Sequence, residues 1–326
     1  MAGNTARDGN KLHAGTASRL KTLWAQASAN PHWVAMDALS RFATVRDSLR
    51  LLRRRPDLSR YDLAASRMAN IEPRECLASL RRDGYFHGLT LPADVVGQLH
   101  AFASDATCYG DADVRAGFRY ADKIAAQVQC ERVFSQATYL FLDEMQSVID
   151  GVATDPLLSF IAASYMNAPP VVTGRRLWWV FATAESDYNT SLTTSFFHYD
   201  KDDYAALRWF FYLSPVPDRN HGPHVVVRGS HTDKRLSQLF SLGERGDHGI
   251  LNCYGPERMD TILGDAGSGF AEDPFCFHKA TRPLTADRLM LEIRFATRNF
   301  DIFPHPDRAA ARNVALPAEV TPVGVT

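Results

Sequence analysis

The chain has 326 residues, of which 45% are hydrophobic and 22% are charged, and it carries a formal net charge of −1. These values exclude an intrinsically disordered chain and predict a folded protein with a sizeable core, as one large domain with an appendage or as two domains. The balanced charge gives the molecule as a whole no electrostatic preference for nucleic acid, and no stretch approaches the roughly 18 apolar residues of a transmembrane helix.

The cysteines show neither a CxxC pair nor a regular spacing. An odd number without a framework favours a reducing compartment, where the thiols act as small buried hydrophobes. Residues 1–15 also lack the apolar run of a signal peptide. We therefore expect a cytoplasmic protein. The five cysteines are Cys76, Cys108, Cys130, Cys253 and Cys276.

Residues 1–70 carry 12 basic and 5 acidic side chains, a net charge of +7, so the rest of the chain carries −8. After a polar start, apolar residues recur every three or four positions over 18–29 and 33–55, which predicts two helices. We expect a basic helical extension whose charged face is solvated or docks on the acidic body. The alternative is an anionic surface, with the helix lying peripherally on a membrane or binding a phosphorylated partner. The basic residues of the second helix are Arg41, Arg46, Arg50, Arg53, Arg54 and Arg55.

A new unit begins near Pro73. Its pattern predicts a helix, a short strand at "GYFHGL" and a second helix that opens at "LPADV". Further helices are predicted at 131–150 and 155–166.

After Pro169 the chain changes to short apolar or alternating runs broken by Gly, Pro, Asn and Asp. Many short strands separated by turns favour a sandwich or barrel over a parallel sheet with crossover helices. We therefore expect an α+β protein in which helices precede a β-barrel or jelly roll, and in which 306–326 is a tail. The predicted strands are 175–184, 193–200, 206–213, 223–228, 261–264, 274–280 and 288–296.

Within the run 193–200, His198 and Asp200 stand two residues apart. On a strand, residues i and i+2 point to one face, so both side chains can reach one metal ion while Tyr199 points away. A third ligand is needed, and the best candidate is His278, 80 residues later among apolar neighbours. Two histidines and one carboxylate form the facial triad of non-haem Fe(II) oxygenases, although the same groups also bind Zn or Mn.

Arg288 follows His278 by ten residues and opens the strand 288–296. A cosubstrate such as 2-oxoglutarate chelates iron through its keto-acid end and presents a distal carboxylate. A forked guanidinium is well suited to bind that carboxylate. Arg288, Met290, Glu292 and Arg294 share one strand face, so Arg294 is the competing candidate.

"FHYDKDDYAALRWFFYLSPVPDRNHGPHVVVRGSH", followed by "FHKATRPLTADRLMLEIRFA", resembles the phytanoyl-CoA dioxygenase family. "LRRDGYFHGLTLPADVV" is similar to the opening segment of that family, so the resemblance spans about residues 73–300. It implies a dioxygenase domain over 71–305 with a double-stranded β-helix core, of the jelly-roll and cupin type, at about 170–300. It also implies Fe(II), 2-oxoglutarate and O₂ as cofactors.

The resemblance assigns the metal to His198, Asp200 and His278, and the distal carboxylate of 2-oxoglutarate to Arg288. Many relatives have a Ser two residues after the distal His, but this chain has Ala280, so Thr281 is expected to supply the second cosubstrate contact. Related halogenases replace the acid of the HxD motif by Gly or Ala. The acid is present here, which indicates a hydroxylase-type oxygenase.

The remaining polar residues near the motif are expected to be structural. Asp202 and Asp203 are predicted to be solvated loop acids, and His231 to stabilise a turn. His221 and His224 lie in a predicted turn that places them either at the surface or facing the pocket.

The expected activity is hydroxylation of an unactivated C–H bond in a small-molecule or lipid- or sugar-type metabolite, with release of succinate and CO₂. Arg282 is predicted to lie in an exposed loop or, being near His278, to hold an anionic substrate. One alternative is a Zn- or Mn-dependent isomerase or hydrolase on the same barrel. Another is a non-catalytic binding protein with a vestigial site, in which the basic N-terminal helices are the working surface.

Overall fold

The computed structural model describes residues 30–68, 71–239, 247–300 and 306–316. The helix predicted at 18–29 lies outside these residues, as does much of the predicted tail. The helix predicted at 33–55 is present as two helices, α2 (Pro31–Leu39) and α3 (Ala43–Leu52). The 3-10 turns η1 (Leu58–Arg60) and η2 (Leu63–Ala65) follow them.

The next three elements match the prediction: α4 (Pro73–Asp83), β1 (Tyr85–Thr90) and α5 (Ala93–Asp105). Gly84 joins α4 to β1 with φ +81°, in the left-handed region that favours glycine. A Cβ at Gly84 would lie 2.2 Å from the Cys276 sulfur. A residue without a side chain is thus required where α4 meets the segment that leads to His278.

The helix predicted at 131–150 is largely wrong. That region contains β4 (Gln136–Thr138), η4 (Asp143–Met145) and only a short helix, α7 (Gln146–Ala153). β4 pairs with β2 and β5, and this non-local pairing overrides the helical periodicity. The predicted helix 155–166 is present as α8 (Pro156–Met166). Elements that the sequence did not indicate are β2 (Thr107–Gly110), β3 (Gly117–Arg119), η3 (Tyr120–Asp122) and α6 (Lys123–Gln129).

The strands form two antiparallel sheets, as expected for a jelly roll of the double-stranded β-helix type. The larger sheet has eight strands in the order β1-β9-β6-β11-β5-β4-β2-β3, and the smaller has the order β10-β7-β8. The strands of the core are β5 (Val171–Val180), β6 (Ala206–Tyr212), β7 (His224–Val227), β8 (Met259–Ile262), β9 (Ser268–Glu272), β10 (His278–Ala280) and β11 (Arg288–Ala296). The remaining short helices are η5 (Glu185–Asp187), α9 (Leu236–Leu239), α10 (Asp247–Tyr254), η6 (Pro256–Arg258) and η7 (Arg308–Ala310).

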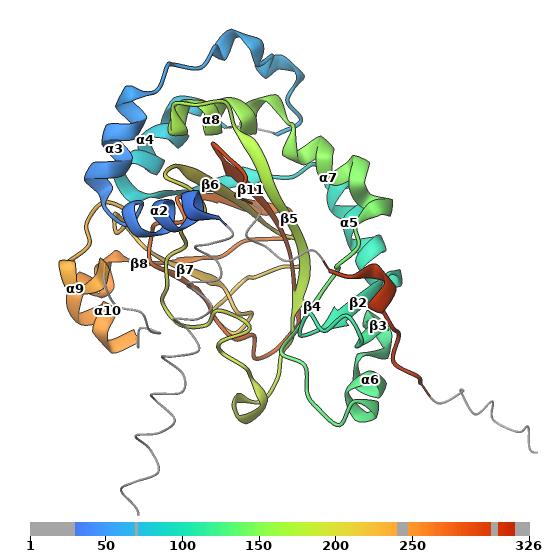
Figure 1. Ribbon diagram of the computed structural model, residues 1–326. Helices are drawn as coiled ribbons and strands as arrows, with labels where there is room; N and C mark the ends of the chain where they lie inside the picture. The colour runs from blue at the N-terminus through green and yellow to red at the C-terminus, as the bar shows by residue number, and fades with distance from the viewer. Residues whose placement is uncertain (1–29, 69–70, 240–246, 301–305, 317–326) are drawn as a thin grey trace, which may run out of the picture.

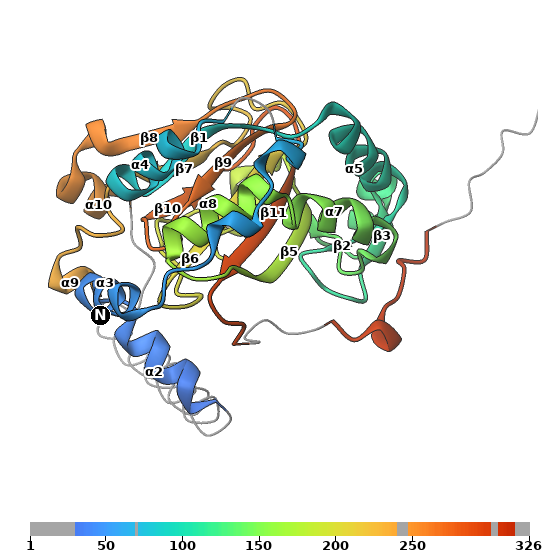
Figure 2. The ribbon, with the colours of Figure 1, turned by 90° about the horizontal axis from the view of Figure 1, so that it is seen from above.

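The molecule has three layers: helices, the larger sheet and the smaller sheet (Figures 1 and 2). Alternation along the central strands divides their side chains between two cores. Trp179 and Trp209 belong to the core that includes residues of α4, α5, α7 and α8, whereas Trp178 and Phe210 face the smaller sheet. The inner face of the larger sheet is therefore the wall that positions the site. Among the described residues, no helix has the length and apolarity needed to span a bilayer.

Candidate metal centre

The three predicted ligands lie together. One ligand atom from each of His198, Asp200 and His278 lies within 4.8 Å of the other two. The Nε2 atoms of His278 and His198 are 3.5 and 3.9 Å from Oδ2 of Asp200. Two imidazoles and one carboxylate thus converge on a single point.

The strand predicted at 193–200 is not formed, so the pair reaches the site in another way. His198 makes an isolated antiparallel bridge with His278, and the backbone N of each donates to the carbonyl O of the other at 3.0 and 2.9 Å. The backbone N of Asp200 donates to the carbonyl O of Pro274 at 2.8 Å. Tyr199 points away from the site as expected and packs edge-on against Phe277. The main chain therefore holds the first two ligands beside the third.

The hydrogen bonds of the two histidines leave both Nε2 atoms available for a metal. Nδ1 of His198 lies 2.9 Å from the carbonyl O of Phe196. Nδ1 of His278 lies 2.8 Å from Oε1 of Glu272 and 3.0 Å from the carbonyl O of Cys276. A proton on Nδ1 is fixed by these acceptors, and the lone pair of Nε2 then faces Asp200.

Glu272 is the supporting residue that the sequence did not reveal. It is completely buried at the end of β9 and also contacts Nε2 of His224 at 2.7 Å. Burial opposes its ionisation, but His278 and His224 together lower the pKa of Glu272 to about 2. In the sequence, Glu272 stands out only as the single acid of β9, at the last position of that strand. Of the two positions predicted for His224, the surface position is excluded. His224 is buried, and its ring centroid lies 5.3 Å from that of His278.

The charges of the three ligands are strongly coupled. Burial, followed by repulsion from His278, lowers the pKa of His198 to about 4. Burial also disfavours protonated His278, but Glu272 and Asp200 outweigh it and raise the pKa of His278 to about 10. Burial opposes ionisation of Asp200, yet Arg208 and the two histidines hold its pKa well below the usual range. A proton and a metal ion therefore compete for Nε2 of His278.

Arg208 on β6 holds the acids around the site, and the sequence did not single it out. One of its terminal nitrogens lies 2.7 Å from Oδ2 of Asp200 and 3.2 Å from Oε1 of Glu292. Its Nε and second terminal nitrogen donate to Asp202 at 2.9 Å each. The expectation that Asp202 and Asp203 are solvated is wrong, since both are buried. Each acid has donors that compensate for its burial, as Asp203 accepts from the backbone N of residue 297 at 2.9 Å.

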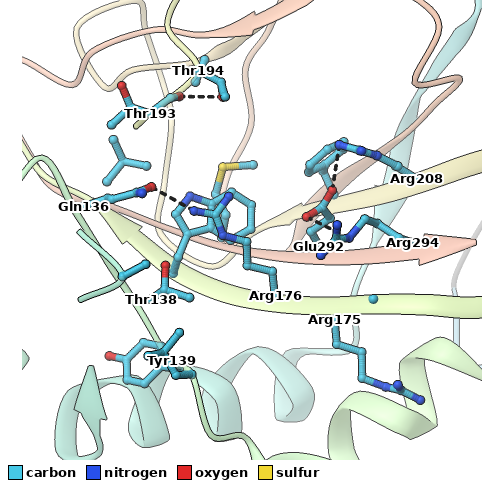
Figure 3. A pocket seen from close by; sticks show the side chains of 18 of the residues that line it. Gln136, Thr138, Tyr139, Arg175, Arg176, Thr193, Thr194, Arg208, Glu292 and Arg294 are labelled. Carbon is cyan, nitrogen blue, oxygen red and sulfur yellow. Dashed lines mark hydrogen bonds and ion pairs between the residues drawn. The ribbon is translucent and has the colours of Figure 1, made fainter. Parts of the chain in front are cut away.

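The metal-ligand cluster opens into a cavity of about 870 Å³ between the two sheets. Arg288, Met290, Glu292 and Arg294 all line it, as the strand alternation predicted. Figure 3 shows part of its wall, where Arg176, Arg208, Glu292 and Arg294 lie on neighbouring strands and Gln136 approaches Arg176 from β4.

Arg288 is the charged residue of this wall whose surroundings call for a ligand. Its side chain is 2% exposed, and its Nε and one terminal nitrogen have no hydrogen-bond partner. No carboxylate in the described part of the chain lies within ion-pair distance of it, and burial lowers the pKa of Arg288. Arg294 differs, because its Nε lies 3.7 Å from Oε2 of Glu292. A buried guanidinium without a counterion is a ready site for a carboxylate that enters the cavity.

Three other residues singled out in the sequence lie away from the cavity wall. Thr281 does not line the cavity, and its hydroxyl donates to the carbonyl O of Pro223 at 2.6 Å. Arg282 also lies outside the cavity wall and donates to the carbonyl O of Thr183 at 2.6 Å. His231 is buried and approaches the carbonyl O of Arg81 at 3.3 Å, which fits a structural role.

No protein-family model matches the chain, and no curated protein matches it. Solved structures with a similar fold include the non-heme alpha ketoglutarate dependent epimerase SnoN from nogalamycin biosynthesis, with 16% identity over 68% of this chain and 82% of that one and a TM-score of 0.48. The apoform of EctD from S. alaskensis has 18% identity over 74% and 86% of the two chains and a TM-score of 0.47. HygX from Streptomyces hygroscopicus, with nickel and 2-oxoglutarate bound, has 15% identity over 76% of this chain and 96% of that one, and a TM-score of 0.46. The chemistry of the site is therefore inferred from the residues of this chain and not from these structures.

Proposed function

We propose that this protein is an Fe(II)- and 2-oxoglutarate-dependent oxygenase. The observation that carries the proposal is a cluster of two imidazoles and one carboxylate that shares a cavity with Arg288, a buried arginine without a counterion. The cluster alone does not identify the metal, because two imidazoles and one carboxylate also suit Zn or Mn. A carboxylate receptor in the same cavity specifically favours an α-keto acid cosubstrate.

The donor set fits ferrous iron. His198, Asp200 and His278 would occupy three positions of an octahedral metal and leave three open, enough for a bidentate keto acid and O₂. When bound, iron with 2-oxoglutarate and O₂ supplies the oxidising power that breaks an unactivated C–H bond, with succinate and CO₂ as co-products. Asp200 would hold the metal with a carboxylate that related halogenases lack, which supports hydroxylation.

The chain supplies orientation and a sheltered site for this chemistry. The carbonyl O of Cys276 accepts from Nδ1 of His278, and the carboxylate of Glu272 lies 2.8 Å from the same nitrogen, so Nε2 is directed to the metal. Arg208 contacts Oδ2 of Asp200 and limits the orientations of that carboxylate. Arg288 would bind the far carboxylate of the cosubstrate through charge-assisted hydrogen bonds. Buried aromatic side chains such as Trp178 and Phe210 exclude water from the wall between these groups.

The substrate end of the cavity favours a small molecule with an anionic group. Arg176 lines the cavity, lies with its guanidinium carbon 4.4 Å above the ring of Trp178, and donates to Oε1 of Gln136 at 2.9 Å. No ion pair joins Arg176 to a carboxylate in the described part of the chain, and burial lowers its pKa to about 10. An anionic group on the substrate would supply the missing countercharge.

The experiment loads the protein with Fe(II) under anaerobic conditions and titrates 2-oxoglutarate while recording the visible absorption spectrum. We expect a 2-oxoglutarate-dependent charge-transfer band, followed on admission of O₂ by succinate. His278→Ala should remove both signals, whereas Arg282→Met, altered outside the cavity wall, should retain them. A protein that binds the metal but shows neither the band nor succinate with any substrate pool would contradict the proposal and favour the isomerase or hydrolase alternative.

A further inference from the structure

A second large cavity lies where the basic N-terminal helix meets the body of the protein. Its volume is about 740 Å³, and it is lined by residues of α3, the loop that follows, α4, α8 and the segment 273–275. None of these residues lines the metal cavity. The side-chain amide of Asn167, just after α8, donates to the carbonyl O of Arg50 at 2.8 Å and ties α3 to the body. The cavity is therefore a separate feature built by the N-terminal extension.

The wall of this cavity is strongly basic, although the whole chain has a net charge of −1. Five arginines and two aspartates line it, a net formal charge of +3. Both acids already have partners. Asp47 pairs with Arg50, and Asp273 accepts from the hydroxyl of Tyr165 and from the backbone N of Phe275. The five arginines are Arg46, Arg50, Arg53, Arg55 and Arg81.

The deeper arginines are held by neutral groups. Arg46 is 8% exposed, donates to the carbonyl O atoms of Ser40 and His231, and stacks on the ring of Phe275 at 3.9 Å. Arg53 donates to the hydroxyl of Thr297 at 3.1 Å. Burial lowers the pKa of both arginines, and nearby acids offset only part of that effect. These interactions fix the positions of the positive charges and leave them without a full countercharge.

We propose that this cavity is a binding site for a phosphate ester. A phosphate group carries up to two negative charges and three acceptor oxygens, which suits several arginines around one space better than a single carboxylate does. The cavity is larger than a phosphate alone requires, and Leu77, Phe160 and Pro56 form an apolar part of its wall. The ligand thus has a phosphate on the arginines and a less polar part against these side chains.

The phosphate group has two candidate sources, the headgroup of a membrane lipid and a soluble metabolite. Leu51 and Leu52, the last residues of α3, are 84% and 83% exposed and precede Arg53. Exposed leucines next to arginines are typical of a helix that rests on an anionic bilayer, where the phosphate is a lipid headgroup. A soluble phosphorylated metabolite offers the same group without a bilayer. Both sources share the chemistry of the proposal, and the experiment separates them.

The test measures binding of pyrophosphate by calorimetry, and binding to phosphatidylcholine vesicles with and without phosphatidic acid by co-sedimentation. We expect Arg50→Gln and Arg53→Gln each to weaken binding by about tenfold or more. Arg54→Gln, in the same basic run but outside the cavity wall, should leave it unchanged. Pyrophosphate binding identifies a soluble ligand, and binding to phosphatidic acid vesicles alone identifies a lipid; either supports the site.

Absence of binding to both probes would overturn the proposal. So would an equal loss in Arg54→Gln, since that would indicate only a diffuse basic surface. Arg50 is partly exposed and has Asp47 as its ion-pair partner, so Arg50→Gln remains informative if Arg53→Gln fails to fold. Iron and 2-oxoglutarate binding should be unaffected by Arg50→Gln, which keeps this test independent of the oxygenase assignment.

Discussion

Replacing Arg288 by methionine should weaken the binding of 2-oxoglutarate, while the metal-free protein stays at least as stable as the parent. The side chain is 2% exposed, two of its nitrogens have no partner, and no carboxylate of the described residues pairs with it. Exchange of a buried ion pair for apolar side chains of similar volume is often neutral or stabilising by about 1–4 kcal/mol, and the removal of Arg288 leaves no described carboxylate without its partner. We therefore expect the metal-free variant Arg288→Met to be at least as stable as the parent protein.

The same change should nearly abolish 2-oxoglutarate binding. A bidentate pair of charge-assisted hydrogen bonds contributes about 1.5–3 kcal/mol per bond, so the loss is about 3–6 kcal/mol. Since about 1.4 kcal/mol corresponds to a factor of ten, the dissociation constant should rise by roughly two to four orders of magnitude. Anaerobic titration of the Fe(II) protein gives the affinity, and urea denaturation of the metal-free protein gives the stability.

Arg294→Met is the matched control, because Arg294 lies on the same strand face but already has Glu292 as a neighbour. Its 2-oxoglutarate affinity should stay within about threefold of the parent value. If Arg294→Met loses affinity while Arg288→Met does not, the distal carboxylate binds Arg294. If Arg288→Met is destabilised and still binds 2-oxoglutarate normally, its charge is satisfied by the protein itself and the reasoning fails.

Three further outcomes follow from the buried charges. Glu272→Gln removes the charge that supports His278 and should weaken metal binding by about 10–100-fold, measured by competition with a chelating dye; an unchanged affinity would show that the contact is incidental. Asp203→Asn weakens the acceptor for the backbone N of Thr297 and should lower the free energy of unfolding by about 1–3 kcal/mol in urea, whereas a solvated acid would show no change. Burial lowers the pKa of His231, so the unfolded state takes up its proton first, and stability is lost as pH falls below the ordinary value near 6.5. In His231→Asn, the decline in stability between about pH 7 and pH 5 should be shallower, and an unaltered slope would refute this linkage.

Local pattern was sufficient for the features that depend on neighbours in the chain. The period of two along β11 places Arg288, Met290, Glu292 and Arg294 on one face, and that face lines the cavity. The helices before and after β1 follow from their apolar spacing and their Gly and Pro boundaries. The residue types of the HxD motif and of the distal histidine predict a metal site, and the fold brings these three side chains together.

Only the tertiary structure decided which charges are buried and what compensates them. Asp202 and Asp203 look like loop acids in the sequence, and their burial depends on Arg208 and on the backbone of residue 297. Glu272 supports His278 because β9 lies beside β6 and the smaller sheet brings β10 across from it. A strand at 136–138 likewise exists because β2 and β5 pair with it on either side. The sequence by itself determined the period of each element and the chemistry of each side chain. Pairing between distant segments determined burial, because the free energy of a buried charge depends on partners that are remote in sequence.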